Sequence, residues 1–196
     1  MKKKEFVSIG KKIKEIREEK KMSLKDLSNK TGYSESILSQ IENHFISPPL
    51  GALLKIANAL DISVGQLLGE SKEEPFVIIR QGSEVPVSRV ASKEGINYGY
   101  SYKSLGIGKK DRHFEPFLIT LEPTPIKHEG LSKHEGEEFI YVLKGTMEVQ
   151  LRDFTEVLEV GDSIFYDSNI PHRVSCIGDK PVVILAVIWS PHVNDK

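Results

Sequence analysis

This chain has few of the features that mark secreted, membrane or disulfide-rich proteins. Its 196 residues include a single cysteine, Cys176, which excludes an internal disulfide and is typical of a reducing compartment. No stretch approaches the roughly 18 apolar residues of a membrane-spanning helix. The basic residues 2–4 precede a polar segment and not the apolar run of a signal peptide. We therefore expect a soluble, cytoplasmic protein that is not associated with a membrane.

The chain also lacks a repeat of fixed period. Its net charge is only −1, but its two parts differ in charge. Residues 1–69 hold 12 Lys/Arg against 8 Asp/Glu, whereas residues 70–196 hold 15 against 20. Residues 70–75 contain no apolar side chain and end in Pro75, which is typical of an exposed linker. We predict a basic domain at 1–69, a linker at 70–75 and an acidic domain at 76–196, and the basic domain suits contact with phosphate.

The basic domain has the apolar spacing and the capping residues of five short helices. The first runs from about Ser8 to Lys20. Ser23 opens the second with Asp26 three residues later, and Gly32 ends it. The third, residues 34–43, begins at Ser34, the fourth follows the two prolines at 48–49, and the fifth spans about 63–69. A helix, a short glycine-containing turn and a second helix form a helix-turn-helix unit.

The third helix has an unusual outer face. Ile37, Leu38 and Ile41 are predicted to form its buried stripe. Four polar residues then face outward: Ser36, Ser39, Gln40 and Asn43. Gln and Asn can bond adenine bidentately in the major groove, and Ser can bond several base edges, so the pattern favours DNA recognition. Because an exposed polar face is more often merely solvated, the surrounding helices have to support this interpretation.

Segments 23–27, 31–34, 39–43 and 53–60 resemble the five-helix domain of xenobiotic-response-element-type regulators, the lambda repressor and Cro-like helix-turn-helix. The resemblance covers residues 8–69. It implies that Lys25 and Ser34 lie near phosphates and that Glu35, Ser36, Ser39 and Gln40 lie toward bases. The alternative is a helical bundle used for protein contact.

Beyond the linker the apolar period changes to that of short strands separated by Gly, Pro, Asp and Asn. We expect nine strands, which argue for a sandwich or a barrel. They lie near residues 76–79, 98–102, 117–121, 139–143, 146–151, 155–160, 163–166, 172–176 and 182–189. Trp189, at the end of the last strand, is expected in the core.

Two spaced motifs in this region resemble those of the cupin fold, over about residues 110–190. His134, Glu138 and Gly145 fit the first motif in register, and Gly161 and His172 fit the second. Asp167 and Asn169 replace the second motif's Pro and Gly, and Ser132 stands where the first motif has another His. The resemblance implies a double-stranded β-helix, a jelly-roll barrel whose mouth can hold a small ligand.

The resemblance also implies a metal site, reduced by Ser132 to His134, Glu138 and His172. Two His and one carboxylate suit a divalent metal, iron(II) above all, with zinc or nickel as alternatives. The other interpretation is that these three side chains are polar anchors at a barrel mouth. Tyr98, Tyr100 and Tyr102 occupy alternate positions, so they point to one face of the sheet. There they either contact a small-molecule effector in the barrel or pack across strands.

A DNA reader fused to a ligand-sized barrel predicts a transcriptional regulator that senses a small molecule, with no catalytic residue. The alternative function is that of an enzyme. The chain also resembles iron-dependent hydroxypropylphosphonate epoxidases, in which a helix-turn-helix domain precedes a cupin with two His and one Glu. One recognition helix reads only a few base pairs, so we expect a homodimer, joined through the β domain, on paired operator half-sites.

Overall fold

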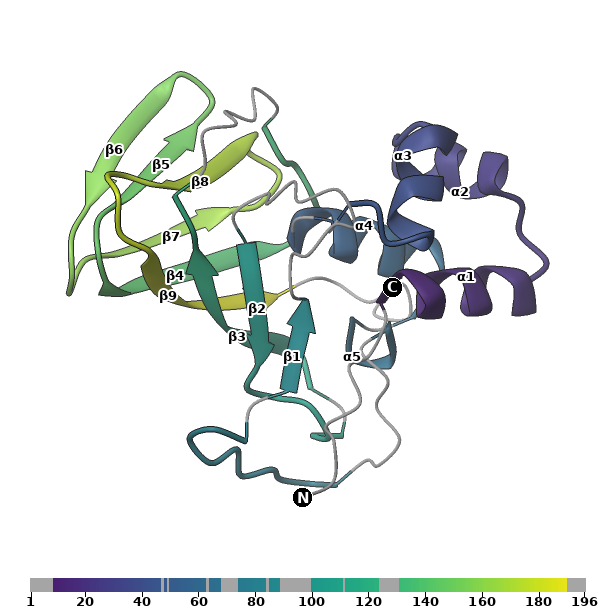
Figure 1. Ribbon diagram of the computed structural model, residues 1–196, viewed down its shortest axis with the longest axis horizontal. Coiled ribbons are helices and arrows are strands. Elements are labelled where there is room, and N and C mark those ends of the chain that lie inside the picture. The colour runs from purple at the N-terminus through teal and green to yellow at the C-terminus, as the bar shows by residue number, and fades with distance from the viewer. Residues whose placement is uncertain are drawn as a thin grey trace.

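The computed structural model describes residues 9–46, 48, 50–62, 64–67, 74–83, 85–88, 100–110, 112–123 and 131–189, and it contains a helical domain beside a β-barrel (Figure 1). The five predicted helices are present as α1 (Ile9–Glu19), α2 (Leu24–Thr31), α3 (Glu35–Glu42), α4 (Leu50–Ala59) and α5 (Val64–Leu67). None of the helices described here is long and apolar enough to cross a membrane.

The turn between α2 and α3 follows from its capping residues. Ser23 and Asp26 form a reciprocal capping box at the start of α2. Gly32 ends α2 with a φ of 75°, in the left-handed region that suits glycine. Ser34 then caps α3 by accepting a hydrogen bond of 3.3 Å from the backbone N–H of Ile37. These local signals produce the predicted helix-turn-helix.

Close packing of α1 against α3 fixes the position of α3. A Cβ added at Gly10 would lie 2.1 Å from the carbonyl oxygen of Ile41, so only glycine fits there. Arg17 of α1 donates to both carboxylate oxygens of Glu42, at 2.7 and 2.9 Å, in a buried ion pair. Helix α3 is thereby held rigidly against α1.

The predicted buried stripe of α3 is only partly correct. Leu38 and Ile41 are buried, but Ile37 is 40% exposed. Successive helical residues point about 100° apart, so Ile37 lies beside the buried stripe and outside it. Its side chain faces the cavity described below.

Within the residues that the structure describes, the barrel is built from nine strands: β1 (Val85–Ser88), β2 (Tyr100–Ser104), β3 (Phe114–Leu121), β4 (Glu137–Lys144), β5 (Met147–Leu151), β6 (Phe154–Leu158), β7 (Ser163–Asp167), β8 (His172–Cys176) and β9 (Val182–Trp189). They form a six-stranded antiparallel sheet in the order β1-β2-β3-β9-β4-β7 and a three-stranded sheet in the order β6-β5-β8. Alternate residues of β3 and β9 are buried between the sheets. The jelly-roll expectation is confirmed.

Two details of the β prediction are wrong. Residues 76–79 have strand-like composition but pair with no described strand, and Phe76 is 70% exposed. Composition favours a strand, yet a strand needs a partner, and β1 takes the place at the sheet edge. Trp189 is 41% exposed because Ile188 points inward and strand alternation turns its neighbour outward.

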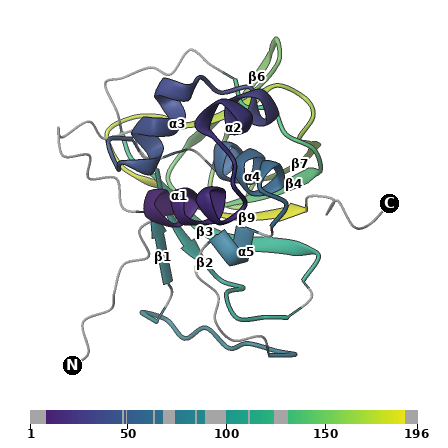
Figure 2. The same cartoon turned by 90° about the vertical axis from the view of Figure 1, so that its right-hand side faces the viewer.

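The helical domain lies across the mouth of the barrel, in front of the strands in Figure 2. The start of α4 lies close to the barrel. A Cβ added at Gly51 would lie 3.1 Å from Cδ2 of His134 and 3.4 Å from Cβ of Ser132. The first motif of the barrel therefore lies directly against the helical domain.

Candidate functional site

Backbone pairing brings the three motif residues together at the barrel mouth. Ser132 and His172 exchange backbone hydrogen bonds of 2.7 and 2.8 Å, which joins the loop before β4 to the start of β8. The backbone N–H of His134 donates to the carbonyl of Ser168 at 3.0 Å. Glu138 follows on β4, paired with Tyr166 of β7. Residues separated by up to 38 positions in sequence thus converge from three elements.

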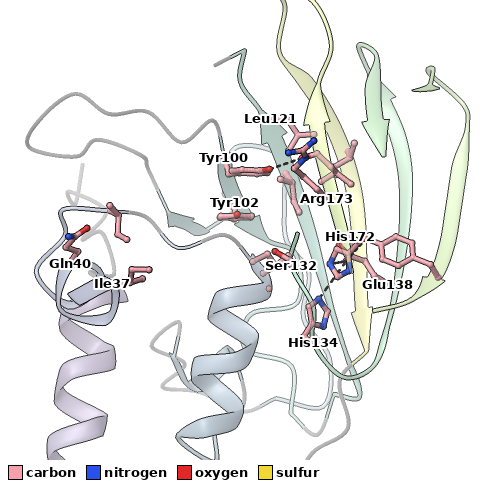
Figure 3. A pocket seen from close by; sticks show the side chains of 17 residues that line it. Ile37, Gln40, Tyr100, Tyr102, Leu121, Ser132, His134, Glu138, His172 and Arg173 are labelled. Atoms are coloured by element: carbon pink, nitrogen blue, oxygen red, sulfur yellow. Dashed lines mark hydrogen bonds and ion pairs between the residues drawn. The ribbon is translucent and has the colours of Figure 1, made fainter. Parts of the chain in front are cut away.

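The side chains of His134, Glu138 and His172 form a buried triad, with ligand atoms within 4.8 Å of one another. Nε2 of His172 lies 3.7 Å and Nε2 of His134 lies 4.0 Å from Oε2 of Glu138 (Figure 3). The two imidazole rings meet edge to face, with centroids 5.2 Å apart. This donor set matches the predicted two-His-one-carboxylate arrangement.

The hydrogen bonds of the rings fix which nitrogen faces the triad. Nδ1 of His172 lies 2.8 Å from the carbonyl oxygen of Ile170, and Nδ1 of His134 lies 3.2 Å from that of Glu135. A carbonyl oxygen only accepts, so Nδ1 carries the proton in both rings. Both Nε2 lone pairs are then free to bind a cation, which is the arrangement found around protein metal ligands. The residues therefore fit a divalent metal.

Burial controls the charge of the triad. It raises the pKa of the Glu138 carboxyl to about 7, although Tyr166 donates a 2.8 Å hydrogen bond to Oε2 that lowers it. Burial also lowers the pKa of His134 to about 4, and that of His172 falls for the same reason. Lys55 of α4 lies near enough to lower both further. Near neutral pH both imidazoles are uncharged, the form that binds metal.

A cavity of about 380 Å³ lies above the triad, between the barrel and the helical domain (Figure 3). This volume suits a small organic ligand. Its barrel wall consists of Tyr100, Tyr102, Ile119, Leu121, Ser132, His134, Glu138, Tyr166, His172, Arg173, Val174 and Ile184. The helical domain contributes Ile37, Gln40, Ile46, Leu50 and Gly51. The site is therefore polar at the triad and largely apolar elsewhere.

Two predicted tyrosines line this cavity. Tyr100 and Tyr102 stack with centroids 6.2 Å apart, and the Tyr100 hydroxyl donates to the carbonyl of Val174 at 2.8 Å. The Tyr102 hydroxyl is buried. Burial raises the pKa of Tyr102, and the nearby backbone of Leu50 lowers it in part. No described group forms a hydrogen bond of normal geometry with this hydroxyl. Tyr98 lies outside the described residues.

The predicted DNA-contacting residues gather on α2 and α3. All are exposed except the half-buried Ser39: Lys25, Ser34, Glu35, Ser36, Ser39, Gln40 and Asn43. Asn43 donates to the carbonyl of Ser39 at 2.8 Å, which orders the end of the helix. Gln40 also borders the cavity, a position that sequence reasoning missed. No sequence pattern could reveal it, because it depends on how the two domains pack.

Two family models match the chain. The cupin domain model matches residues 117–188, and the helix-turn-helix model matches residues 13–67. The two matches lie on the barrel and on the helical domain, and both resemblances are confirmed.

The curated proteins that are similar in sequence include two regulators and one enzyme. The HTH-type transcriptional regulator PuuR of Escherichia coli is 27% identical over 173 residues, 87% of this chain and 89% of PuuR. The HTH-type transcriptional regulator SinR of Bacillus subtilis is 33% identical over 100 residues, 46% of this chain and 90% of SinR. The (S)-2-hydroxypropylphosphonic acid epoxidase of Streptomyces wedmorensis is 27% identical over 168 residues, 82% of this chain and 84% of the epoxidase.

A solved structure shares the whole architecture. The helix-turn-helix family transcriptional regulator from Vibrio cholerae superimposes with a TM-score of 0.64 at 24% identity, covering 94% of this chain and 96% of that one. This likeness supports the fold, a helix-turn-helix followed by a cupin barrel. The two family models and the similar regulators, SinR at 33% identity above all, show that the chain belongs to the helix-turn-helix transcriptional regulators that carry a cupin domain.

Proposed function

We propose that this chain is a cytoplasmic, sequence-specific DNA-binding regulator whose cupin domain senses a small molecule. The observation that carries the proposal is an exposed polar recognition helix in the same chain as a buried, ligand-sized cavity. Lys25 and Ser34 contact phosphates, and the bases are read by Glu35, Ser36, Ser39, Gln40 and Asn43. The similar regulators PuuR and SinR come from bacteria, whose chromosome lies in the cytoplasm, and this supports a cytoplasmic location.

The effector binds in the cavity, against Tyr100, Tyr102 and the triad of His134, Glu138 and His172. The two available Nε2 atoms and the buried carboxyl support a divalent metal there, which is iron(II), zinc or nickel. His134, Glu138 and His172 would hold the metal, whose positive charge would attract an oxygen atom of the effector. Ser132 removes a fourth ligand, so we expect modest metal affinity.

The regulator works as a homodimer joined through its β domain. The outer face of the six-stranded sheet carries apolar side chains that are half-buried or exposed: Phe139, Tyr141, Leu143, Phe165 and Trp189. Phe139 and Phe165 are paired across β4 and β7, with ring centroids 6.4 Å apart. A contiguous apolar face of this kind supports association with a second copy.

An iron-dependent oxygenase or epoxidase is the alternative, favoured by the two-His-one-Glu triad and by the similar epoxidase. The outer face of α3 argues against it, because an enzyme has no need of Ser36, Ser39 and Gln40 on an exposed helix. The similarity to regulators favours the same conclusion.

The deciding experiment enriches duplexes from a random-sequence pool with the purified full chain and measures its metal content in parallel. We expect a two-fold symmetric motif with half-sites about one helical turn apart. No enrichment over non-specific DNA would contradict the regulator proposal.

We also expect a divalent metal that mild chelation removes. A protein that carries none, and takes up no iron(II), zinc or nickel, would contradict both the metal site and the oxygenase alternative. The triad would then act as polar anchors for an organic effector. Thermal-shift screening of the wild-type chain against the triple alanine variant of His134, Glu138 and His172 would test that role.

A further inference from the structure

The cavity is built from both domains. Its barrel side holds the triad, and the helical domain lines it with Ile37 and Gln40 of α3 (Figure 3) and with Leu50 and Gly51 of α4. A ligand that fills the cavity therefore contacts the recognition helix itself. Effector binding and helix position are linked by direct contact, with no relay through the sheet.

Gln40 belongs both to the outer polar face of α3 and to the lining of the cavity. It lies on the polar face of α3 that carries Ser36 and Asn43, and its side chain also borders the cavity. A recognition helix reads bases only when this face enters a major groove about 12 Å wide. Because Gln40 also borders the cavity, an effector in the cavity and a base in the groove would both contact this one side chain.

We propose that this docked arrangement is the DNA-free form of the regulator, with the effector held between the two domains against Ile37, Gln40 and Gly51. Operator DNA then binds only after the helical domain has moved away from the barrel mouth. Effector and operator oppose each other because both use the Gln40 side of α3. This inference rests on the proposed function, since it specifies how the same site is regulated.

The contact at Gly51 offers a direct test. A Cβ at Gly51 would lie 3.4 Å from Cβ of Ser132, close to the 3.5–4.5 Å separation of a disulfide. The double variant Gly51→Cys, Ser132→Cys is made in a Cys176→Ser background, which removes the chain's one native thiol. The disulfide stands in for the unidentified effector because it holds the same two walls together.

Mild oxidation should form an intramolecular cross-link, visible as a mobility shift in non-reducing electrophoresis. Affinity for a duplex enriched by the wild-type chain should fall at least tenfold on oxidation and return on reduction of the same sample. The reduced sample is the matched control. Failure to cross-link, or a cross-linked protein that binds the duplex undiminished, would overturn the inference.

A second variant at the same position has the opposite expected sign. Gly51→Phe wedges α4 away from the barrel, because even a Cβ there lies 3.1 Å from His134. Its affinity for the duplex should equal or exceed that of the wild type. Loss of specific binding with the helical circular dichroism signal intact would overturn the inference. If the wild-type chain enriches no duplex, the proposed function has failed and the inference fails with it. If it does and the disulfide has no effect, only the inference has failed.

Discussion

Glu138 is subject to opposing requirements, since it is the carboxyl of the triad and lies buried in the barrel. Its pKa is raised from 4.5 to about 7 in the folded chain. The unfolded chain therefore loses this proton at lower pH than the folded chain does. The favourable contribution of Glu138 to stability is present below about pH 4.5 and is lost as pH rises through about 7.

The variant Glu138→Gln should remove this dependence. We compare the free energies of unfolding of the variant and the wild type in the presence of a chelator. The difference, variant minus wild type, should increase by on the order of 2 to 3 kcal/mol from about pH 5 to about pH 8. His134 has the opposite linkage, because its lowered pKa means that its contribution is lost as pH falls from 6.5 toward about 4. That loss occurs in both proteins and cancels in the comparison. Urea denaturation at both pH values measures the difference, and a constant difference would contradict the prediction.

The second residue-scale prediction separates base contacts from phosphate contacts. Gln40→Ala should weaken binding to the specific duplex by about 1 to 3 kcal/mol and change binding to random DNA little. Lys25→Ala should weaken both and reduce the dependence of affinity on salt. Fluorescence anisotropy titrations at several salt concentrations measure these effects. Equal losses on both duplexes for Gln40→Ala would exclude a base-reading role.

At the scale of elements, the recognition helix depends on the buried ion pair between α1 and α3. Only 9% of the Arg17 side chain and 3% of the Glu42 side chain are exposed. Arg17 also donates to the carbonyl of Met22 at 2.8 Å, so it secures the turn into α2 as well. Removing one charge leaves the other buried without its partner.

Arg17→Met should therefore destabilise the helical domain by about 3 to 5 kcal/mol. The double variant Arg17→Met, Glu42→Leu should recover much of this loss, because no buried charge remains. The exposed pair Lys11 and Glu15, 3.6 Å apart, is the control, and Glu15→Gln should change stability by less than about 1 kcal/mol. Thermal denaturation followed by circular dichroism measures all three. A double variant no more stable than Arg17→Met would contradict the prediction.

At the scale of the whole molecule, dimerisation decides whether one short helix can specify an operator. We predict that light scattering shows a dimer at micromolar concentration without DNA. Phe165 is 65% exposed on the outer sheet face, and Phe165→Glu should shift the protein to monomers because it sets a charge in the interface. Phe154 of β6, 57% exposed on the other sheet, is the matched control, and Phe154→Glu should leave the dimer intact. A wild-type monomer would count against the dimer.

The local elements of this protein could be predicted from its amino-acid sequence. Capping residues such as Ser23, Asp26 and Ser34 act over three or four positions, so they specify the helix-turn-helix without reference to the rest of the chain. The motif spacing from His134 to Glu138 and on to His172 likewise predicted the triad, because a strand's alternation and a fixed fold determine which side chains converge. Residues 76–79 show the limit of this reasoning, since strand propensity needs a partner strand.

The orientation of the site side chains and the second wall of the cavity depend on tertiary packing. The orientation of Nε2 in both histidines depends on the carbonyls of Glu135 and Ile170, and the second wall of the cavity depends on the packing of α4 against the barrel. Neither has a local sequence signal, because both arise between segments that are distant in the chain or that belong to different domains. Ile37 illustrates this, since an apolar residue beside a core stripe is indistinguishable in sequence from one that lines a ligand cavity.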